Sequence, residues 1–112
     1  MDHNDVQLTG KLSGAPEHRE MPSGDTQTAW RLVVRRPQPR PRAVVDTIRC
    51  VTYDPDVTAF VEGLASGDRM EISGAIRCRI YGPSHAKVWR YEVEVASATR
   101  AVVPEAGAVA AC

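Results

Sequence analysis

Apolar and polar residues alternate with a period of two along most of this chain, and this alternation predicts β-strands. It is clearest in residues 76–81, Ile-Arg-Cys-Arg-Ile-Tyr. Because successive side chains of a strand point to opposite faces, one apolar face is expected to cover a core, with Ile76, Cys78 and Ile80. The opposite face carries two cations and an aromatic ring in one row, namely Arg77, Arg79 and Tyr81.

The same alternation predicts five strands, over residues 4–12, 26–36, 45–53, 68–81 and 87–100. A helix is predicted between the third and fourth strands, because Asp54 and Pro55 form a helix-start signal. One apolar stripe with helical spacing follows, at Val57, Phe60, Val61 and Leu64. Residues 13–25 are expected to form a long loop or hairpin arm. Residues 37–42 contain three prolines and are expected to form a basic flexible loop.

Five strands and one short helix are too few for an immunoglobulin-type sandwich. They suit an all-β fold, a small five-stranded barrel of the oligonucleotide/oligosaccharide-binding (OB) type, with the helix between strands three and four. Trp30 shares the parity of Leu32 and is expected in the core, while Trp89 shares the parity of Val93 and is expected in the core or at a subunit interface. We expect one domain over residues 1–103 and a low-complexity tail over 104–112, disordered or docked on a partner.

The charge of the chain is unevenly distributed. The 112 residues have a formal net charge of zero, which at first argues against nucleic acid as a partner. Between Trp30 and Cys50, however, six arginines are opposed only by Asp46, and six minus one leaves a local excess of plus five. Such a local patch matters more to a phosphate backbone than the net charge does. The six are Arg31, Arg35, Arg36, Arg40, Arg42 and Arg49.

A second segment repeats the pairing of cation and ring. In residues 47–53, Arg49 and Tyr53 share a face with Thr47. Arginines spaced with rings on a sheet suit a flexible polyanion with stackable bases, although ordinary solvated strand faces show the same pattern. The candidates on the open face are Arg31, Arg35, Arg49, Tyr53, Arg77, Arg79 and Tyr81. The arm with Arg36, Arg40 and Arg42 would wrap the strand, and Lys11 and Lys87 would add charge at the rim.

Other chemistry has little support in the sequence. No His, Cys or acidic pair has metal-ligand spacing, no serine has a base beside it, and no P-loop occurs, so we expect no enzyme, metal or cofactor. Cys50 and Cys78 lie in strand patterns and are expected to be buried and inert, which fits a reducing cytoplasm. There is no apolar run of membrane-spanning length, and the polar N-terminus does not read as a signal peptide.

Four segments carry a joint pattern around the helix. Residues 4–12 open with Asn-x-Val and contain Gly10, and residues 15–24 contain Pro-Glu and then Pro-x-Gly. Residues 49–53 precede the predicted helix and residues 67–74 follow it. In order and spacing these segments resemble the bacterial single-stranded DNA-binding protein family, over about residues 4 to 100.

The resemblance implies a cytoplasmic, nucleoid-associated protein that binds single-stranded DNA without sequence preference, in replication, recombination or repair. It implies base stacking on Tyr53 and Tyr81, and homotetramers built from dimers paired partly through their first strands. Thr47 stands where a Trp is common in the family, and Gln38 and prolines replace a ring in the preceding loop. The chain also lacks the family's acidic C-terminal tip, so it resembles a short paralogue or a truncated form, and tail-mediated recruitment of replication proteins is not expected.

Two alternatives follow from these departures. The lost rings and the missing tip are also expected of a paralogue that has drifted into a protein-interaction subunit. An OB-type protein that prefers RNA is the nearer alternative, because RNA offers the same phosphates and stackable bases.

Overall fold

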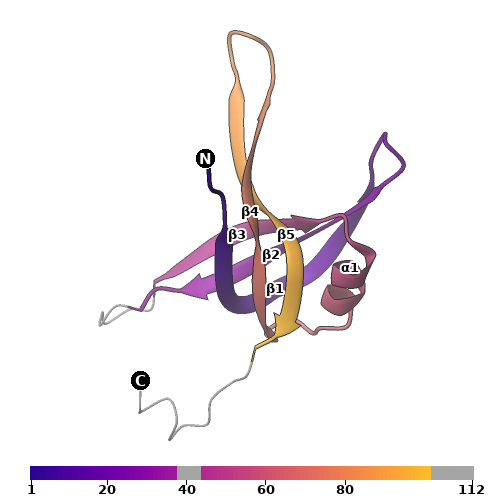
Figure 1. The fold of residues 1–112 in the computed structure, drawn as a ribbon, viewed down its shortest axis with the longest axis vertical. Helices are drawn as coiled ribbons and strands as arrows, with labels where there is room; N and C mark the ends of the chain where they lie inside the picture. Colours follow the sequence, from indigo (N-terminus) through magenta and orange to yellow (C-terminus); the bar gives the residue numbers. More distant parts are fainter. Residues whose placement is uncertain (38–43, 102–112) are drawn as a thin grey trace, which may run out of the picture.

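The computed structural model describes residues 1–37 and 44–101, which form five strands and one helix (Figure 1). The elements are β1 (Val6–Glu20), β2 (Thr26–Arg35), β3 (Val45–Thr52), α1 (Pro55–Glu62), β4 (Arg69–Tyr81) and β5 (Val88–Arg100). The strands close into a barrel in the order β1-β2-β3-β5-β4, in which only the β3–β5 pair is parallel. The predicted all-β barrel, with its helix between the third and fourth strands, is confirmed.

β1 is longer than expected and serves two neighbours. Its residues 6–11 pair with β4, and its residues 11–20 pair with β2. The register shifts between Ser13 and Glu17, where Gly14 adopts a φ of +77° that glycine reaches without strain. Of the two alternatives predicted for residues 13–25, the hairpin arm is confirmed and the long loop is wrong. A β-bulge absorbs Gly14 and Pro16 and bends the strand without ending it, and only residues 21–25 form the turn.

One apolar cluster fills the barrel, with contributions from all five strands and the helix. Its members are Leu12, Trp30, Leu32, Cys50, Val57, Val61, Leu64, Met70, Ile72, Val93 and Val95. Trp30 is 3% exposed, which confirms the core position predicted from its parity. Burial raises the pKa of the Cys50 thiol to about 12, so this cysteine stays protonated and unreactive at neutral pH, as expected.

The helix begins where the sequence predicts. The Asp54 side chain accepts a hydrogen bond from the Asp56 backbone N–H at 2.8 Å, and Pro55 takes the first helical position. Val57 and Val61 then point into the core. The helix ends at Glu62, so Leu64, the last residue of the predicted stripe, lies just beyond it. Within residues 1–37 and 44–101, no helix is long and apolar enough to cross a membrane.

The outer halves of β4 and β5 form a hairpin that leaves the barrel (Figure 1). β1 pairs with β4 only as far as Gly74, and β3 pairs with β5 only at Val93 and Glu94, so beyond Ile76 the two strands pair with each other alone. The prediction that Ile76, Cys78 and Ile80 face a core is therefore wrong, because no second layer covers them. Ile76 is 48% exposed and Ile80 51%, and Cys78 is exposed where burial was predicted. Trp89 is likewise 60% exposed and is not a core residue.

Gly74 lies at the crossing of β4 and β5, where the register shifts. A Cβ atom added there would collide with the carbonyl oxygen of Glu94. We therefore expect Gly74→Ala to lower the free energy of unfolding by about 2 kcal/mol, as other overpacking substitutions do. Urea denaturation followed by circular dichroism measures this loss.

Gly63→Ala is the matched control. A Cβ on Gly63 would meet only ordinary contacts, the nearest at 3.5 Å from the Phe60 carbonyl oxygen, and its backbone is right-handed helical with φ of −76°. The urea midpoint of the Gly63→Ala variant should stay near that of the wild type. Equal stability of the two alanine variants would contradict the close approach at Gly74.

Candidate nucleic-acid interface

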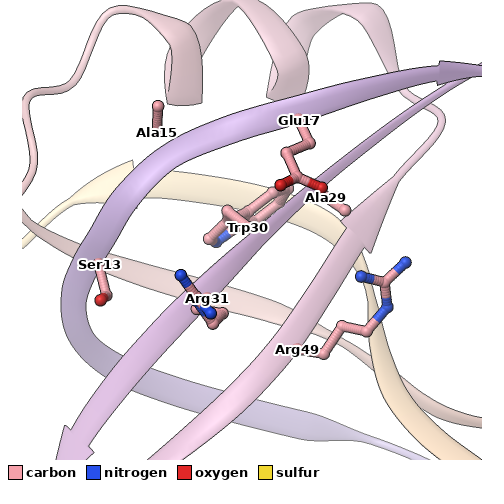
Figure 2. A pocket seen from close by; sticks show the side chains of 7 residues that line it. All are labelled: Ser13, Ala15, Glu17, Ala29, Trp30, Arg31 and Arg49. Atoms are coloured by element: carbon pink, nitrogen blue, oxygen red, sulfur yellow. The ribbon is translucent and has the colours of Figure 1, made fainter.

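Arg31 of β2 and Arg49 of β3 lie side by side on the outer surface, because they are opposed residues of an antiparallel pair. They border a hollow of about 110 Å³ beside the bulge of β1 (Figure 2). Its lining consists of Ser13, Ala15, Glu17, Ala29, Trp30, Arg31 and Arg49. Arg31 is exposed and forms no ion pair with any residue that the structure describes, and the Glu17 carboxylate lines the same hollow.

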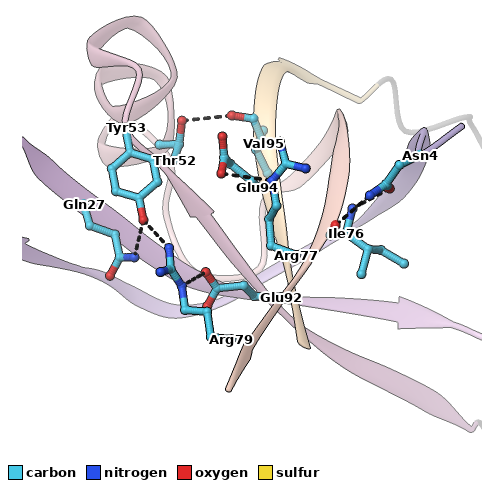
Figure 3. A network of polar contacts seen from close by, with 10 residues as sticks. All are labelled: Asn4, Gln27, Thr52, Tyr53, Ile76, Arg77, Arg79, Glu92, Glu94 and Val95. Atoms are coloured by element: carbon cyan, nitrogen blue, oxygen red, sulfur yellow. Dashed lines mark hydrogen bonds and ion pairs between the residues drawn. The ribbon is translucent and has the colours of Figure 1, made fainter. Parts of the chain in front are cut away.

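A polar network joins four strands next to this hollow (Figure 3). Glu92 of β5 accepts hydrogen bonds from the Nε atoms of Arg49, at 3.1 Å, and Arg79, at 3.0 Å. Nη2 of Arg79 also donates to the Tyr53 hydroxyl at 2.6 Å, and Nε2 of Gln27 donates to the same oxygen at 3.0 Å. The bond to Glu92 raises the pKa of Arg79 above its ordinary value. Glu92 therefore holds both arginines through their Nε atoms.

Ion pairs make the predicted basic region less positive than its sequence suggests. Arg36 pairs with Asp46 at 2.7 Å, and this hydrogen bond lowers the pKa of Asp46. Arg49 pairs with Glu92, so six arginines now face two acids and the excess falls from plus five to plus four. Arg35 is exposed and, among the residues described, has no acidic partner.

The charged face of β4 and β5 carries further side chains on both sides of Arg79, with Arg77 toward the barrel and Tyr81 toward the hairpin tip. Arg77 pairs with Glu94 at 3.3 Å. Tyr81 is 45% exposed, and the guanidinium carbon of Arg90 lies 5.5 Å from the centre of its ring, within cation–π distance. Nζ of Lys87 donates to the Gly82 carbonyl at the hairpin tip, at 3.2 Å.

The structure therefore divides the predicted residues into groups. Arg31, Arg49, Tyr53, Arg77 and Arg79 lie together on and beside the barrel, while Tyr81 and Lys87 lie further out on the hairpin. Arg35 and Arg36 lie at the end of β2 and just after it, away from the network. Arg40 and Arg42 are outside the described residues, as is Gln38, and Lys11 lies on β1 opposite Val33.

Sequence reasoning assigned no role to Gln27, Glu92, Glu94 and Arg90, all of which contact predicted site residues. A signal for the acids was present. Glu92 and Glu94 alternate with valines, which places them on the polar face of the last strand. A row of acids on the partner of a strand that carries Arg77 and Arg79 indicates cross-strand ion pairs.

Topology and surface together define an OB-fold protein with a cationic, ring-bearing outer face. Residues 3–102 match the single-strand binding protein family, and the chain belongs to this family. The family is one of DNA-binding proteins that are not enzymes. No curated protein matches the sequence.

Two solved structures show a closely similar fold. One is the small single-stranded DNA-binding protein from Streptomyces coelicolor, with a TM-score of 0.70 and 14% identity over 91% of this chain and 97% of that chain. The other is the Plasmodium falciparum SSB in complex with single-stranded DNA, with a TM-score of 0.72 and 16% identity over 88% of this chain and 93% of that chain. At such identities the likeness shows the fold alone.

The Tyr53 hydroxyl accepts two hydrogen bonds, so its removal leaves two donors without their partner. We expect Tyr53→Phe to lower the free energy of unfolding by about 1 kcal/mol. Tyr81→Phe is the control, because the Tyr81 hydroxyl makes no hydrogen bond with any residue described here and should be nearly neutral. Urea titration of both variants measures the difference, and equal stabilities would contradict the network around Tyr53.

Proposed function

We propose that this protein binds single-stranded DNA without sequence preference, by stacking bases on Tyr53 and Tyr81 and pairing phosphates with arginines. The observation that carries the proposal is the convergence of Arg49, Tyr53 and Arg79 on one outer face, from β3, the residue after it, and β4. Membership of the single-strand binding family supports it, as does the likeness to a structure solved with single-stranded DNA. The protein would protect exposed strands in replication, recombination or repair, in the cytoplasm with the nucleoid, and would catalyse no reaction.

The distribution of charge suits a backbone that runs from the barrel to the hairpin. Arg79 supplies a cation at Tyr53, Arg31 and Arg49 supply cations further along β2 and β3, and Arg90 and Lys87 supply cations near Tyr81. Phosphate contacts of this kind release counterions, so log affinity should fall with log salt by about 0.7 per phosphate neutralised. Arg36, held by Asp46, contributes less than the sequence suggests, because a phosphate must compete with that acid.

Removal of either ring should weaken binding. Each stacked base contributes roughly 1–3 kcal/mol, so we expect Tyr53→Ala and Tyr81→Ala each to reduce affinity for a fluorescein-labelled oligothymidylate by that amount. Fluorescence anisotropy at several salt concentrations measures both the affinity and its salt slope. Tyr81→Phe keeps the ring and is the control, which should bind as the wild type does.

Three outcomes would contradict this proposal. The double Tyr53→Ala, Tyr81→Ala variant binding like the wild type would exclude stacking on these rings. Wild-type protein without measurable binding would favour the protein-interaction alternative. Stronger binding to an RNA oligonucleotide of matched sequence would favour the RNA-binding alternative.

We also propose that copies of the chain associate, as a homotetramer built from dimers, through the apolar face of the β4–β5 hairpin. This face carries large exposed side chains, at Ile76, Ile80, Trp89 and Tyr91. It continues into an apolar groove of about 300 Å³ whose wall includes Val6 and Leu8 of β1. The first half of β1 pairs on one side only in the described part of the chain, so an open strand edge adjoins the groove and favours a second copy as the occupant.

A charge placed on this face should separate the subunits. Ile80 is already 51% exposed, so Ile80→Glu should leave an isolated subunit folded and lower the assembly's molar mass in size-exclusion chromatography with light scattering. Val88→Glu is the matched control, since Val88 is 47% exposed in the same hairpin and opposes Tyr81 on the charged face. A monomeric wild type, or an unchanged mass for Ile80→Glu, would contradict this interface.

A further inference from the structure

Glu92 is the only carboxylate side chain fully buried in the part of the chain that the structure describes. Its side chain is 1% exposed, whereas those of its partners Arg49 and Arg79 are 35% and 46% exposed. A buried carboxylate is costly unless it is paired and hydrogen-bonded. Glu92 meets that requirement by giving one oxygen to each arginine, Oε1 to Arg49 and Oε2 to Arg79.

The geometry of these bonds orients the arginines. Both are held at Nε, the inner nitrogen of the guanidinium group, so Glu92 does not occupy their outer nitrogens. One outer nitrogen of Arg79, Nη2, reaches the hydroxyl of Tyr53 and holds the edge of that ring (Figure 3). Glu92 of β5 thus binds Arg49 of β3 and Arg79 of β4. Through Arg79 it also acts on Tyr53, the residue that follows β3.

We propose that Glu92 is a positioning residue of the single-strand-binding face. It aligns Arg49 with both outer nitrogens, and Arg79 with Nη1, available to phosphates, and through Nη2 of Arg79 it fixes the ring on which a base stacks. This inference rests on the proposed function. The benefit is pre-organisation, because long side chains that are already ordered lose less conformational entropy when the ligand binds.

The opposing effect of Glu92 is electrostatic. Two arginines and one acid leave this group with a formal charge of plus one instead of plus two, which weakens the attraction for phosphate. If Glu92 acted only as a neutralising charge, its removal would tighten binding. If it positions the face, its removal weakens binding although the net charge becomes more positive. The two roles therefore predict changes of opposite sign.

Glu92→Gln tests this difference, with Glu94→Gln as the matched control. Glu94 pairs with Arg77 at 3.3 Å, its side chain is 38% exposed, and its substitution removes the same single negative charge. We expect Glu92→Gln to bind labelled oligothymidylate about tenfold more weakly than the wild type, near the lower part of the range for one stacked base. We expect Glu94→Gln to bind at least as tightly as the wild type. Binding by Glu92→Gln that equals or exceeds that of Glu94→Gln would overturn the proposal.

A double-mutant cycle with Tyr53→Phe tests the route through the ring. Tyr53→Phe keeps the ring but removes the hydroxyl that Arg79 holds, so Glu92→Gln should cost less affinity in this background than in the wild type. Losses that simply multiply would show that Glu92 does not act through Tyr53. A merely structural weakening would lower affinity in both backgrounds alike and would not produce this coupling.

Two further measurements keep the outcomes distinct. If urea titration shows that Glu92→Gln does not fold, Glu92→Asp replaces it. Aspartate keeps the charge but is too short to reach both Nε atoms, so it should still weaken binding, and wild-type affinity in Glu92→Asp would overturn the proposal. Failure of the wild type itself to bind oligothymidylate would overturn the proposed function, whereas wild-type binding unaffected by either Glu92 variant would overturn the positioning role alone.

Discussion

The closure of the barrel depends on a short parallel contact between β3 and β5. Only Cys50↔Val93 and Val51↔Glu94 pair across it, and Gly74 lets β4 cross directly over the Glu94 backbone. Two consequences follow from this close approach. The valines of β5 enter the core, and the alternating acids of the same strand are placed beneath the arginines of the outer face. The architecture of the barrel wall thus also determines the electrostatics of the candidate binding surface.

The strands β4 and β5 have different roles in the barrel and in the hairpin. In the barrel, one face of β4 and β5 is covered by the rest of the sheet and the other meets solvent. Beyond the Arg77–Glu92 pair the hairpin has no covering layer, so both of its faces are exposed. One face carries Tyr81 with Arg90, and the other carries Ile80 with Trp89. A two-sided hairpin of this kind can present one face to nucleic acid and the other to a second subunit, which is how we interpret it.

Charge compensation distinguishes this surface from a simple basic patch. Arg36, Arg49, Arg77 and Arg79 all have acidic partners, and only one of those acids, Glu92, is buried. Exposed pairs contribute little to stability because solvent screens them, so their arginines can exchange a carboxylate for a phosphate. A buried acid is not available for such exchange, because its separation from both arginines would leave a charge without solvent or partner. Glu92 therefore holds Arg49 and Arg79 in position, whereas Asp46 and Glu94 only lower the positive charge of the surface.

The sequence by itself determined the number of strands and their succession along the chain, and the helix start at Asp54 and Pro55. It also determined the core position of Trp30 and the presence of arginines and tyrosines on common faces. These features follow from local periodicity and capping, which neighbouring residues specify. Only the tertiary structure decided that β1 continues through its bulge, that Ile76, Ile80 and Trp89 are uncovered, and that Arg49 lies over Glu92. The two-residue alternation of a strand indicates which side chains share a face, but it does not indicate whether another layer covers that face. The pairing of Arg49 with Glu92 spans 43 positions in the chain, and such a contact exists only after β5 has closed the barrel.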